Sequence, residues 1–231
     1  MNRLKLPATF SERFNLILFT LVIPLVILPC SAQQMPRGMS IEMVHAKTAK
    51  SVPQADDQNA VVIVINDKGS IFDGIEPVSA EALVSRLKKL PPSGGDVYVK
   101  ADARADYKYV LAVLEALRES GIETPVLLTA QPEPLRANGR ISPTGLPVQL
   151  RGIPRQRQVA IQLQHVGKRQ VARIDGKDVL QPDWQSVLRD TLRGDKSVLV
   201  TAGGDVSYAD VIGLIDSARA AGAQAVILKH S

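Results

Sequence analysis

The residues best placed for chemistry are one acid and two tyrosines at the ends of expected strands and helices. Asp102 follows the apolar run Val97–Val99 and therefore stands at the end of an expected strand. Of the acids in this region, it is the candidate for a role in binding. Tyr107 and Tyr208 each stand in the first turn of a helical run. A tyrosine there either packs its ring beneath the turn and points its hydroxyl to water, or contributes to binding. The sequence leaves both roles open.

No catalytic, metal-binding or cofactor-binding motif occurs in the sequence. There is no nucleophile elbow, phosphate loop or HExxH. Gly203-Gly204-Asp205 lacks the following Lys and Ser/Thr of a phosphate loop, and Asp106 is expected to cap a helix. The three histidines are widely separated, and the single Cys30 excludes an internal disulfide or a Cys-based zinc cluster. We therefore expect a protein that is not an enzyme and holds no metal or cofactor.

The same order of elements occurs twice along the chain. Within residues 60–130 and 158–230, a buried strand is followed at the same spacing by a tyrosine and then by a glycine that ends a helix. The matching positions are Val97–Val99, Tyr107 and Gly121 in the first copy and Val198–Val200, Tyr208 and Gly222 in the second. A shared spacing of small β/α units indicates duplication.

Apolar periodicity predicts a ββαβαβ order for each copy. The first copy is expected to hold strands Ala60–Asn66 and Ser70–Phe72, a helix capped by Ser79, strand Val97–Val99, a helix capped by Asp106, and strand Pro125–Thr129. The second is expected to hold strands Val159–Leu163 and Val171–Ile174, a helix opened by Pro182-Asp183-Trp184, strand Val198–Val200, helix Tyr208–Ala221, and strand Ala225–Lys229. The predicted fold class is α+β, with two tandem small domains, 60–130 and 158–231, whose helices lie on one face of a mixed sheet.

An uncharged apolar stretch, residues 14–32, follows a basic N-terminus, residues 1–13. It is long enough to be a transmembrane anchor with the N-terminus in the cytoplasm. A cleaved signal or a lipoprotein signal ending at Cys30 is the alternative, although Pro29 matches a lipoprotein signal poorly. A buried core helix is disfavoured because Pro24 and Pro29 would break it. All three interpretations place residues 33–231 outside the cytoplasm.

Two segments of the sequence are expected to be irregular and solvated. Residues 33–59 are polar and lack periodicity, which predicts a flexible tether. Residues 131–157 are rich in proline, which disfavours helices and central strands, and in arginine, which either keeps a linker soluble or contacts an anionic lipid or acidic polymer. The net charge of +5 is a mild excess that does not argue for nucleic-acid binding.

The stretch Val97–Thr129 resembles the ExbD/TolR family. The resemblance rests on Lys100-Ala101-Asp102 at a strand end, then Tyr107, then Gly121 after the helix, and on earlier matches at Gly38–Met43, Val61–Ile65 with Lys68-Gly69, and Pro77-Val78-Ser79. It covers roughly residues 14–130, and the second copy looks like the same fold in a more diverged form, with Gly203 in place of Asp102. The resemblance makes Lys100, Asp102, Tyr107 and Tyr208 candidates for partner binding.

The resemblance implies a role as a single-pass subunit of the bacterial Ton or Tol energy-transducing systems. The chain would sit in the inner membrane with its domains in the periplasm, and would act in biopolymer transport or envelope integrity. Its implied partners are a multi-helix membrane protein of the ExbB/TolQ type, a TonB/TolA-like protein or peptidoglycan, and further copies of itself.

One departure from the family concerns proton flow. Members carry an Asp in the membrane helix, and rough alignment places that position near Phe19, Thr20 or Leu21, none of which is acidic. An intramembrane carboxylate is costly and is kept only for function, so its absence removes the proton carrier. We therefore expect an accessory or proton-inactive member. The alternative is an exported or lipid-anchored binding or scaffold protein with no motor role.

Overall fold

The computed structural model describes residues 41–90, 96–130, 142–152, 158–167, 169–193 and 197–229. These residues belong to one compact unit, Met39–Ser231. The N-terminal residues 1–13, the apolar segment 14–32 and the first part of the expected tether lie outside the described residues. Within the described ranges, no helix has the length and apolar character needed to cross a membrane.

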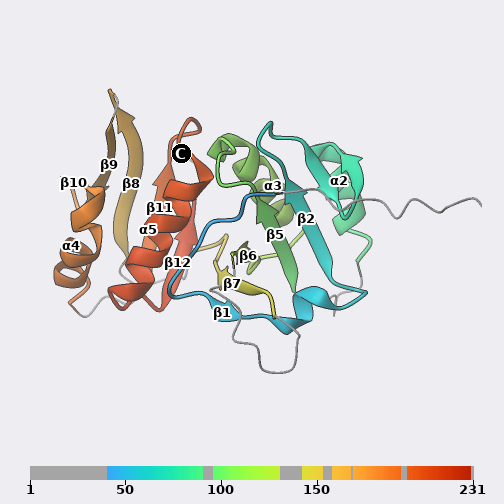
Figure 1. Cartoon of the computed structure of the whole chain (residues 1–231), viewed down its shortest axis with the longest axis horizontal. Helices are drawn as coiled ribbons and strands as arrows, with labels where there is room; N and C mark the ends of the chain where they lie inside the picture. The colour runs from blue at the N-terminus through green and yellow to red at the C-terminus, as the bar shows by residue number, and fades with distance from the viewer. Residues whose placement is uncertain are drawn as a thin grey trace, which may run out of the picture. The chain divides into compact units, whose positions relative to one another are not determined.

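Each copy forms a mixed sheet with two helices (Figure 1). The first copy contains β2 (Val61–Ile65), β3 (Ile71–Asp73), β4 (Glu76–Val78), α2 (Ala80–Leu87), β5 (Val97–Ala101), α3 (Tyr107–Glu119) and β6 (Val126–Thr129). The second contains β8 (Val159–Val166), β9 (Arg169–Ile174), β10 (Lys177–Leu180), η3 (Gln181–Asp183), α4 (Trp184–Thr191), β11 (Ser197–Ala202), α5 (Tyr208–Ala220) and β12 (Ala225–Leu228). The expected α+β class with two tandem sheets is confirmed.

The structure adds one strand to the expected order of each copy. After β3 and after β9, the chain reverses and returns as an edge strand, β4 or β10. Asp175 (φ 47°) and Gly176 (φ 81°) form the turn in the second copy, where positive φ favours glycine. The strand β4 was not predicted because it contains Pro77. Proline is nevertheless compatible with an edge strand, because all it lacks is one backbone N–H donor.

The helices of each copy cover one face of its sheet. In the first copy, buried leucines of α2 and α3 pack over alternate residues of the parallel strands β2, β5 and β6. The buried residues of this layer include Leu83, Leu87, Leu114, Leu117, Ile63, Ile65, Val99 and Leu127. The same continuous cluster extends into the second copy through residues such as Val206, Tyr208 and Val211. The two copies therefore share a core.

The opposite face of the first sheet is covered by residues that precede the first copy. Met43, Val52 and Ala55 pack with Tyr98, Val126 and Leu128 in a second, smaller apolar cluster. This covering segment includes β1 (Lys50–Ser51) and the 3-10 helix η2 (Pro53–Asp56). The prediction of a flexible tether is therefore wrong for residues 41–59. Their apolar residues are too irregularly spaced to produce a periodic signal.

The expected linker also contributes to the first sheet. Strand β7 (Thr144–Pro147) pairs antiparallel with β6 on one side and with β1 on the other. Leu146 and Val148 are each only 1% exposed, so this part is not the solvated spacer that its prolines predicted. The prolines stand at or outside the ends of the strand, and Gly145 allows close approach because a Cβ there would lie 2.5 Å from Val126 Cγ1. Residues 131–141 and 153–157 lie outside the described residues, and the domain boundaries remain predictions.

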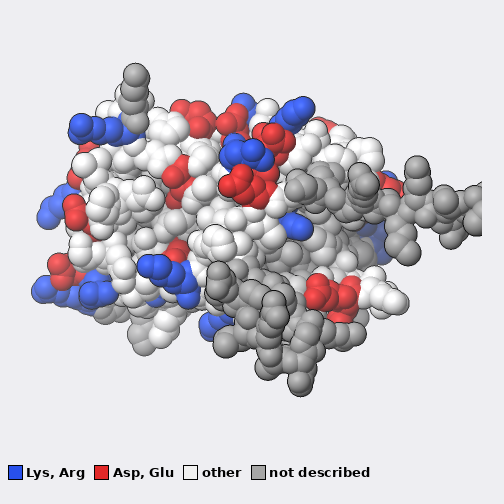
Figure 2. All heavy atoms as spheres, viewed as in Figure 1, with Lys and Arg blue, Asp and Glu red and all other residues white. Residues whose placement is uncertain are grey.

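Charged side chains of both signs are interspersed on the face of the molecule seen in Figure 2. Exposed ion pairs occur in the described part of the chain, such as Arg86 with Asp73 at 3.0 Å and Arg173 with Asp178 at 2.7 Å. Each exposed pair of this kind contributes little to the free energy of unfolding. This face therefore presents a mixed surface rather than a patch of one sign.

Candidate functional site

The two copies are joined through the segments that begin α3 and α5. The backbone N–H of Tyr107 donates to the carbonyl of Val206 at 2.8 Å, and the N–H of Tyr208 donates to the carbonyl of Ala105 at 2.9 Å. Tyr107 matches Tyr208, and Ala105 matches Val206, so each bond has its counterpart at the equivalent position. The contact therefore has the self-complementary form of a symmetric dimer interface, built within one chain.

A second pair of bonds extends this junction. Lys108 N–H donates to the carbonyl of Gly204, and Ala209 N–H donates to the carbonyl of Ala103, each at 3.0 Å. A Cβ at Gly204 would lie 3.2 Å from Lys108 Cβ, so glycine permits the close approach of the two copies. From the sequence, Gly204 was weighed as part of a phosphate-binding turn, and its role at the junction was not predicted. The matched spacing of the two helix starts was the signal that could have indicated this role.

Tyr107 and Tyr208 meet inside this junction. They are 1% and 0% exposed, and burial raises the pKa of both phenols. The hydroxyl of Tyr208 is buried and lacks a hydrogen-bond partner among the described residues. The expectation that such a hydroxyl points to water is therefore wrong for Tyr208. Both rings pack the copies together and do not form a surface for a ligand.

The two helix starts are capped differently. Ser207 Oγ accepts from the backbone N–H of Asp210 at 3.3 Å and so caps α5. Asp106 makes no side-chain cap bond and instead pairs with Lys108 Nζ at 2.8 Å, so its predicted role was wrong. The first two N–H groups of both helices are bonded to carbonyls of the other copy, so this junction does not by itself explain the difference in capping.

Asp102 holds the segment that leads into the first copy. Its carboxylate accepts from the backbone N–H of Glu42 at 3.1 Å and of Arg104 at 3.0 Å, and from Arg104 Nε at 2.9 Å. The side chain of Asp102 is only 2% exposed. The hydrogen bond from the Arg104 guanidinium is the main cause that lowers the pKa of Asp102 to about 2. Asp102 is therefore an ionised anchor for the backbone of residue 42.

Asp216 of α5 holds the same segment from the second copy. Its carboxylate accepts from the N–H of Thr48 at 2.7 Å, from the hydroxyl of Thr48 at 2.6 Å and from the N–H of Lys47 at 3.1 Å. We call Asp102, Asp216 and residues 42–48 the tether-docking site. This site ties the chain on the N-terminal side of the first copy to both copies at once. Sequence reasoning did not single out Asp216, because an acid on a helix usually faces solvent.

Lys100 lies apart from the other candidates, on the sheet face that the tether covers. It is half-buried on β5 and lines a cavity of about 390 Å³ together with Met43, Asp56 and Leu128. The tyrosines, by contrast, belong to the core on the helix side of the sheet. The structure therefore brings Tyr107 and Tyr208 together, but it does not gather the four candidates into one site.

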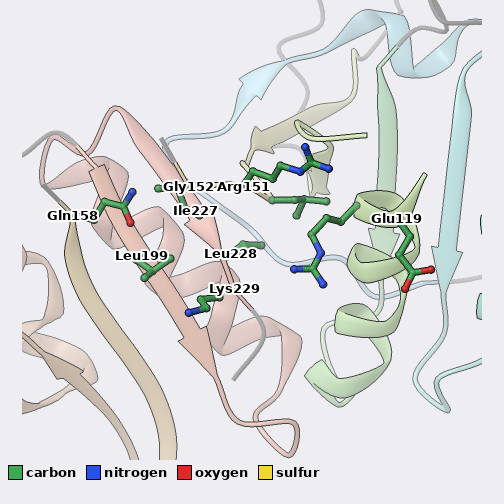
Figure 3. Close-up of a pocket in the computed structure, with 10 residues that line it drawn as sticks. Glu119, Arg151, Gly152, Gln158, Leu199, Ile227, Leu228 and Lys229 are labelled. Atoms are coloured by element: carbon green, nitrogen blue, oxygen red, sulfur yellow. The ribbon is translucent and has the colours of Figure 1, made fainter. Parts of the chain in front are cut away.

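A groove lies between the end of α3 and the sheet of the second copy. It has a volume of about 650 Å³ and is lined by Arg118, Glu119, Leu150, Arg151, Gly152, Gln158, Leu199, Ile227, Leu228 and Lys229 (Figure 3). Its lining combines apolar side chains from β11 and β12 with charged side chains from outside these strands. No described residues form a cluster of His, Cys, Asp or Glu that could hold a metal ion.

Comparison with known proteins identifies the family. The family description "Biopolymer transport protein ExbD/TolR" matches residues 17–132, which include most of the apolar segment, the tether and the first copy. The chain belongs to the ExbD/TolR family. The resemblance expected from Val97–Thr129 is confirmed.

Two curated relatives illustrate how distant this family member is. The biopolymer transport protein ExbD of Escherichia coli (strain K12) is 26% identical over 80 residues, which cover 34% of this chain and 57% of the relative. The ExbD protein of Shigella flexneri gives the same identity and coverage. The chain thus spans little more than half the length of the curated relatives it matches.

Proposed function

We propose that this chain is a non-enzymatic, accessory subunit of an ExbD/TolR-type complex that serves biopolymer transport or envelope integrity. Residues 14–32 would anchor it in the bacterial inner membrane, with both copies in the periplasm. A multi-helix membrane protein of the ExbB/TolQ type would be its partner in the membrane. A TonB/TolA-like protein or peptidoglycan would be its partner outside it. Family membership supports this assignment, and the lack of any catalytic motif in the sequence supports a role without catalysis.

The observation that carries the accessory role is the junction between the copies. The backbone groups that begin α3 are bonded to the second copy of the same chain, through Tyr107 with Val206 and Tyr208 with Ala105. A chain that satisfies this contact internally does not need another subunit at that surface. We infer that it acts as a self-paired body attached to the membrane segment through the tether-docking site. Any assembly with further copies would use other surfaces.

The sequence of the apolar segment supports a role without proton transfer. Phe19, Thr20 and Leu21 have no proton to exchange near neutral pH, whereas a membrane carboxylate can be tuned to do so. The chain would therefore depend on an acidic paralogue for energy coupling, or would serve as a passive tether.

Complementation tests this proposal. In a strain that lacks the regular proton-carrying subunit, the unmodified chain should not restore proton-dependent uptake or envelope integrity. Thr20→Asp tests whether a carboxylate at that depth supplies the missing step, and Thr20→Asn is the matched uncharged control. Restoration by the unmodified chain, with no acidic paralogue present, would overturn the accessory role.

The membrane assignment needs a separate test. Intact-mass analysis of the purified chain should show residues 1–32 retained, and an ExbB/TolQ-like protein should co-purify with it in mild detergent. Cleavage before Gln33 or lipidation of Cys30 would instead favour an exported or lipid-anchored scaffold with no motor role.

A further inference from the structure

The first sheet carries a lysine in the middle of a largely apolar face. Lys100 stands on β5, the middle strand of this sheet, and shares with Tyr98 the face that the tether covers (Figure 1). Its in-register neighbour on β2 is Val64, which is 8% exposed. An ammonium group beside apolar side chains is costly unless solvent or a partner satisfies it. The second copy has Thr201 at the equivalent position, so the fold itself does not require a lysine there.

Lys100 lines the cavity of about 390 Å³ that lies between this sheet and the tether. Asp56 of η2 also lines it, and within the described residues neither side chain forms an ion pair or a side-chain hydrogen bond. Much of the remaining lining is apolar and includes Met43, Val62 and Pro143, which are each only partly buried and so keep surface for a ligand to cover. The volume lies within the range of about 300–1,000 Å³ that is usual for ligand sites.

The charges of the lining indicate the chemistry of a ligand. The cavity offers one ammonium, from Lys100, and one carboxylate, from Asp56, so neither sign is in excess. A ligand with a single charge would satisfy one of these groups and bring a like charge near the other. A ligand that carries both charges would satisfy both groups, and an apolar body would cover the apolar part of the lining.

We propose that this cavity binds a small zwitterion with an apolar body, either an apolar α-amino acid or a short apolar peptide with both termini free. Its carboxylate would face Lys100, its ammonium would face Asp56, and its apolar side chain would contact Met43 and Val62. Because the lining comes from both the sheet and the tether, the bound ligand would hold the two together. The inference does not use the accessory role proposed above, so either can fail without the other.

Calorimetric titration of the full-length chain in mild detergent tests the proposal with two probes, L-leucine and leucyl-leucine. At least one of them should bind saturably, and the tighter one tells whether the source is a free amino acid or a peptide. The amide of that probe lacks the carboxylate, its N-acetyl form lacks the ammonium, and glycine or glycyl-glycine lacks the apolar body. Each of these should bind at least about fivefold more weakly. No saturable binding of either probe, or equal binding of the blocked forms, would overturn the proposal.

Protein variants assign the two charges of the ligand to their partners. Lys100→Met should weaken binding about fivefold or more and should abolish the preference for the free probe over its amide. Asp56→Asn should weaken binding by a similar factor and abolish the preference over the N-acetyl form instead. Lys177→Met on the exposed strand β10 and Asp57→Asn beside the cavity are the matched controls and should change neither preference. An equal loss toward every form of the probe would show that the variants only loosen the cavity, and would contradict the assigned contacts.

Hydrogen exchange locates the bound ligand in the parent chain. The N–H of Val52 donates to the carbonyl of Pro143 at 2.8 Å, and the N–H of Ala55 donates to the carbonyl of Val52 at 3.0 Å. Because these bonds hold the tether against the sheet, a saturating concentration of the probe should slow exchange of both amides. Exchange at Leu192, which follows α4 in the second copy, should stay the same. Saturable binding without added protection at Val52 and Ala55 would place the ligand elsewhere and would overturn the proposal.

Discussion

The carboxylate of Asp216 accepts hydrogen bonds from both the backbone N–H and the hydroxyl of Thr48, at 2.7 and 2.6 Å. Thr48 precedes the first copy, whereas Asp216 lies on α5 of the second. The contact therefore fixes the N-terminal side of the described chain to the copy that is more distant in sequence.

Removal of the Asp216 charge is expected to loosen the tether. Asp216→Asn should lower the free energy of unfolding by about 1–2 kcal/mol, because backbone donors lose a charged acceptor. Hydrogen exchange of the amides of Lys47 and Thr48 should become faster. Asp190→Asn, which alters only an exposed pair with Arg193, is the control and should change neither quantity. Unchanged protection at Thr48 would contradict the role of Asp216.

Asp102 is expected to make the stability depend on acid pH. Its pKa falls from 3.8 to about 2 in the folded chain, so its contribution is complete above pH 4 and is lost as the pH falls through about 2. We expect this contribution to be about 1–2 kcal/mol, since exposed Arg104 is partly screened by solvent. Urea unfolding between pH 5 and pH 2 should show a smaller loss in Asp102→Asn than in the parent chain. Parallel curves for the two proteins would rule out this linkage.

Loss of the Tyr208 hydroxyl is expected to be neutral or stabilising. That oxygen is buried without a partner in the described part of the chain, so Tyr208→Phe removes a desolvated polar group and keeps the ring. The expected gain is about 0–1 kcal/mol in chemical denaturation. Tyr208→Ala is the contrasting variant and should cost about 3–5 kcal/mol through the cavity it leaves. A large loss in Tyr208→Phe would indicate that the hydroxyl has a bonded role.

The two copies are expected to unfold together. They share one continuous buried cluster, and Trp184, the only tryptophan, reports on the second copy alone. Its fluorescence and the far-ultraviolet circular dichroism of the whole chain should therefore give the same denaturation midpoint.

Gly204→Val should separate these two transitions, because its side chain would crowd Lys108 at the junction. Gly167→Val is a control in the hairpin of the second copy, where a Cβ meets open space; its positive φ would destabilise that copy without touching the junction. Separate midpoints in the parent chain would show that the copies are independent.

The order of elements was predictable because it rests on local signals. Apolar periodicity located the main helices and the parallel strands, and the helix-ending glycines Gly121 and Gly222 adopt the expected positive φ. The strands β4 and β7 were missed because each contains a proline, which was taken to argue against a strand although it is compatible with strand ends and edges. Their pairing depends on neighbours that no local pattern reveals.

The site was less predictable, because its contacts join residues far apart in sequence. The partner-binding role expected of Asp102 stays a prediction, and its structural partner Glu42 lies 60 residues away. The change from Asp102 to Gly203 becomes intelligible only in the structure. The N–H groups of both residues bond to a carbonyl of the neighbouring strand, at Ile65 or Leu163, yet only the first copy uses a carboxylate there to hold a preceding segment.

The way in which residues 42–51 attach to the folded unit also decides how it would respond to mechanical load. A pull transmitted along the chain from its N-terminal side reaches the bonds of Glu42 with Asp102 and Ala103 first, and then the bond of Val44 with Ala130. The bonds of Thr48 with Asp216 and the short β1–β7 pair follow. The attachments are met in succession, so tension would open them one at a time while the shared core behind them remains folded. Residues 42–51 would then lengthen in several steps before tension reaches the two copies.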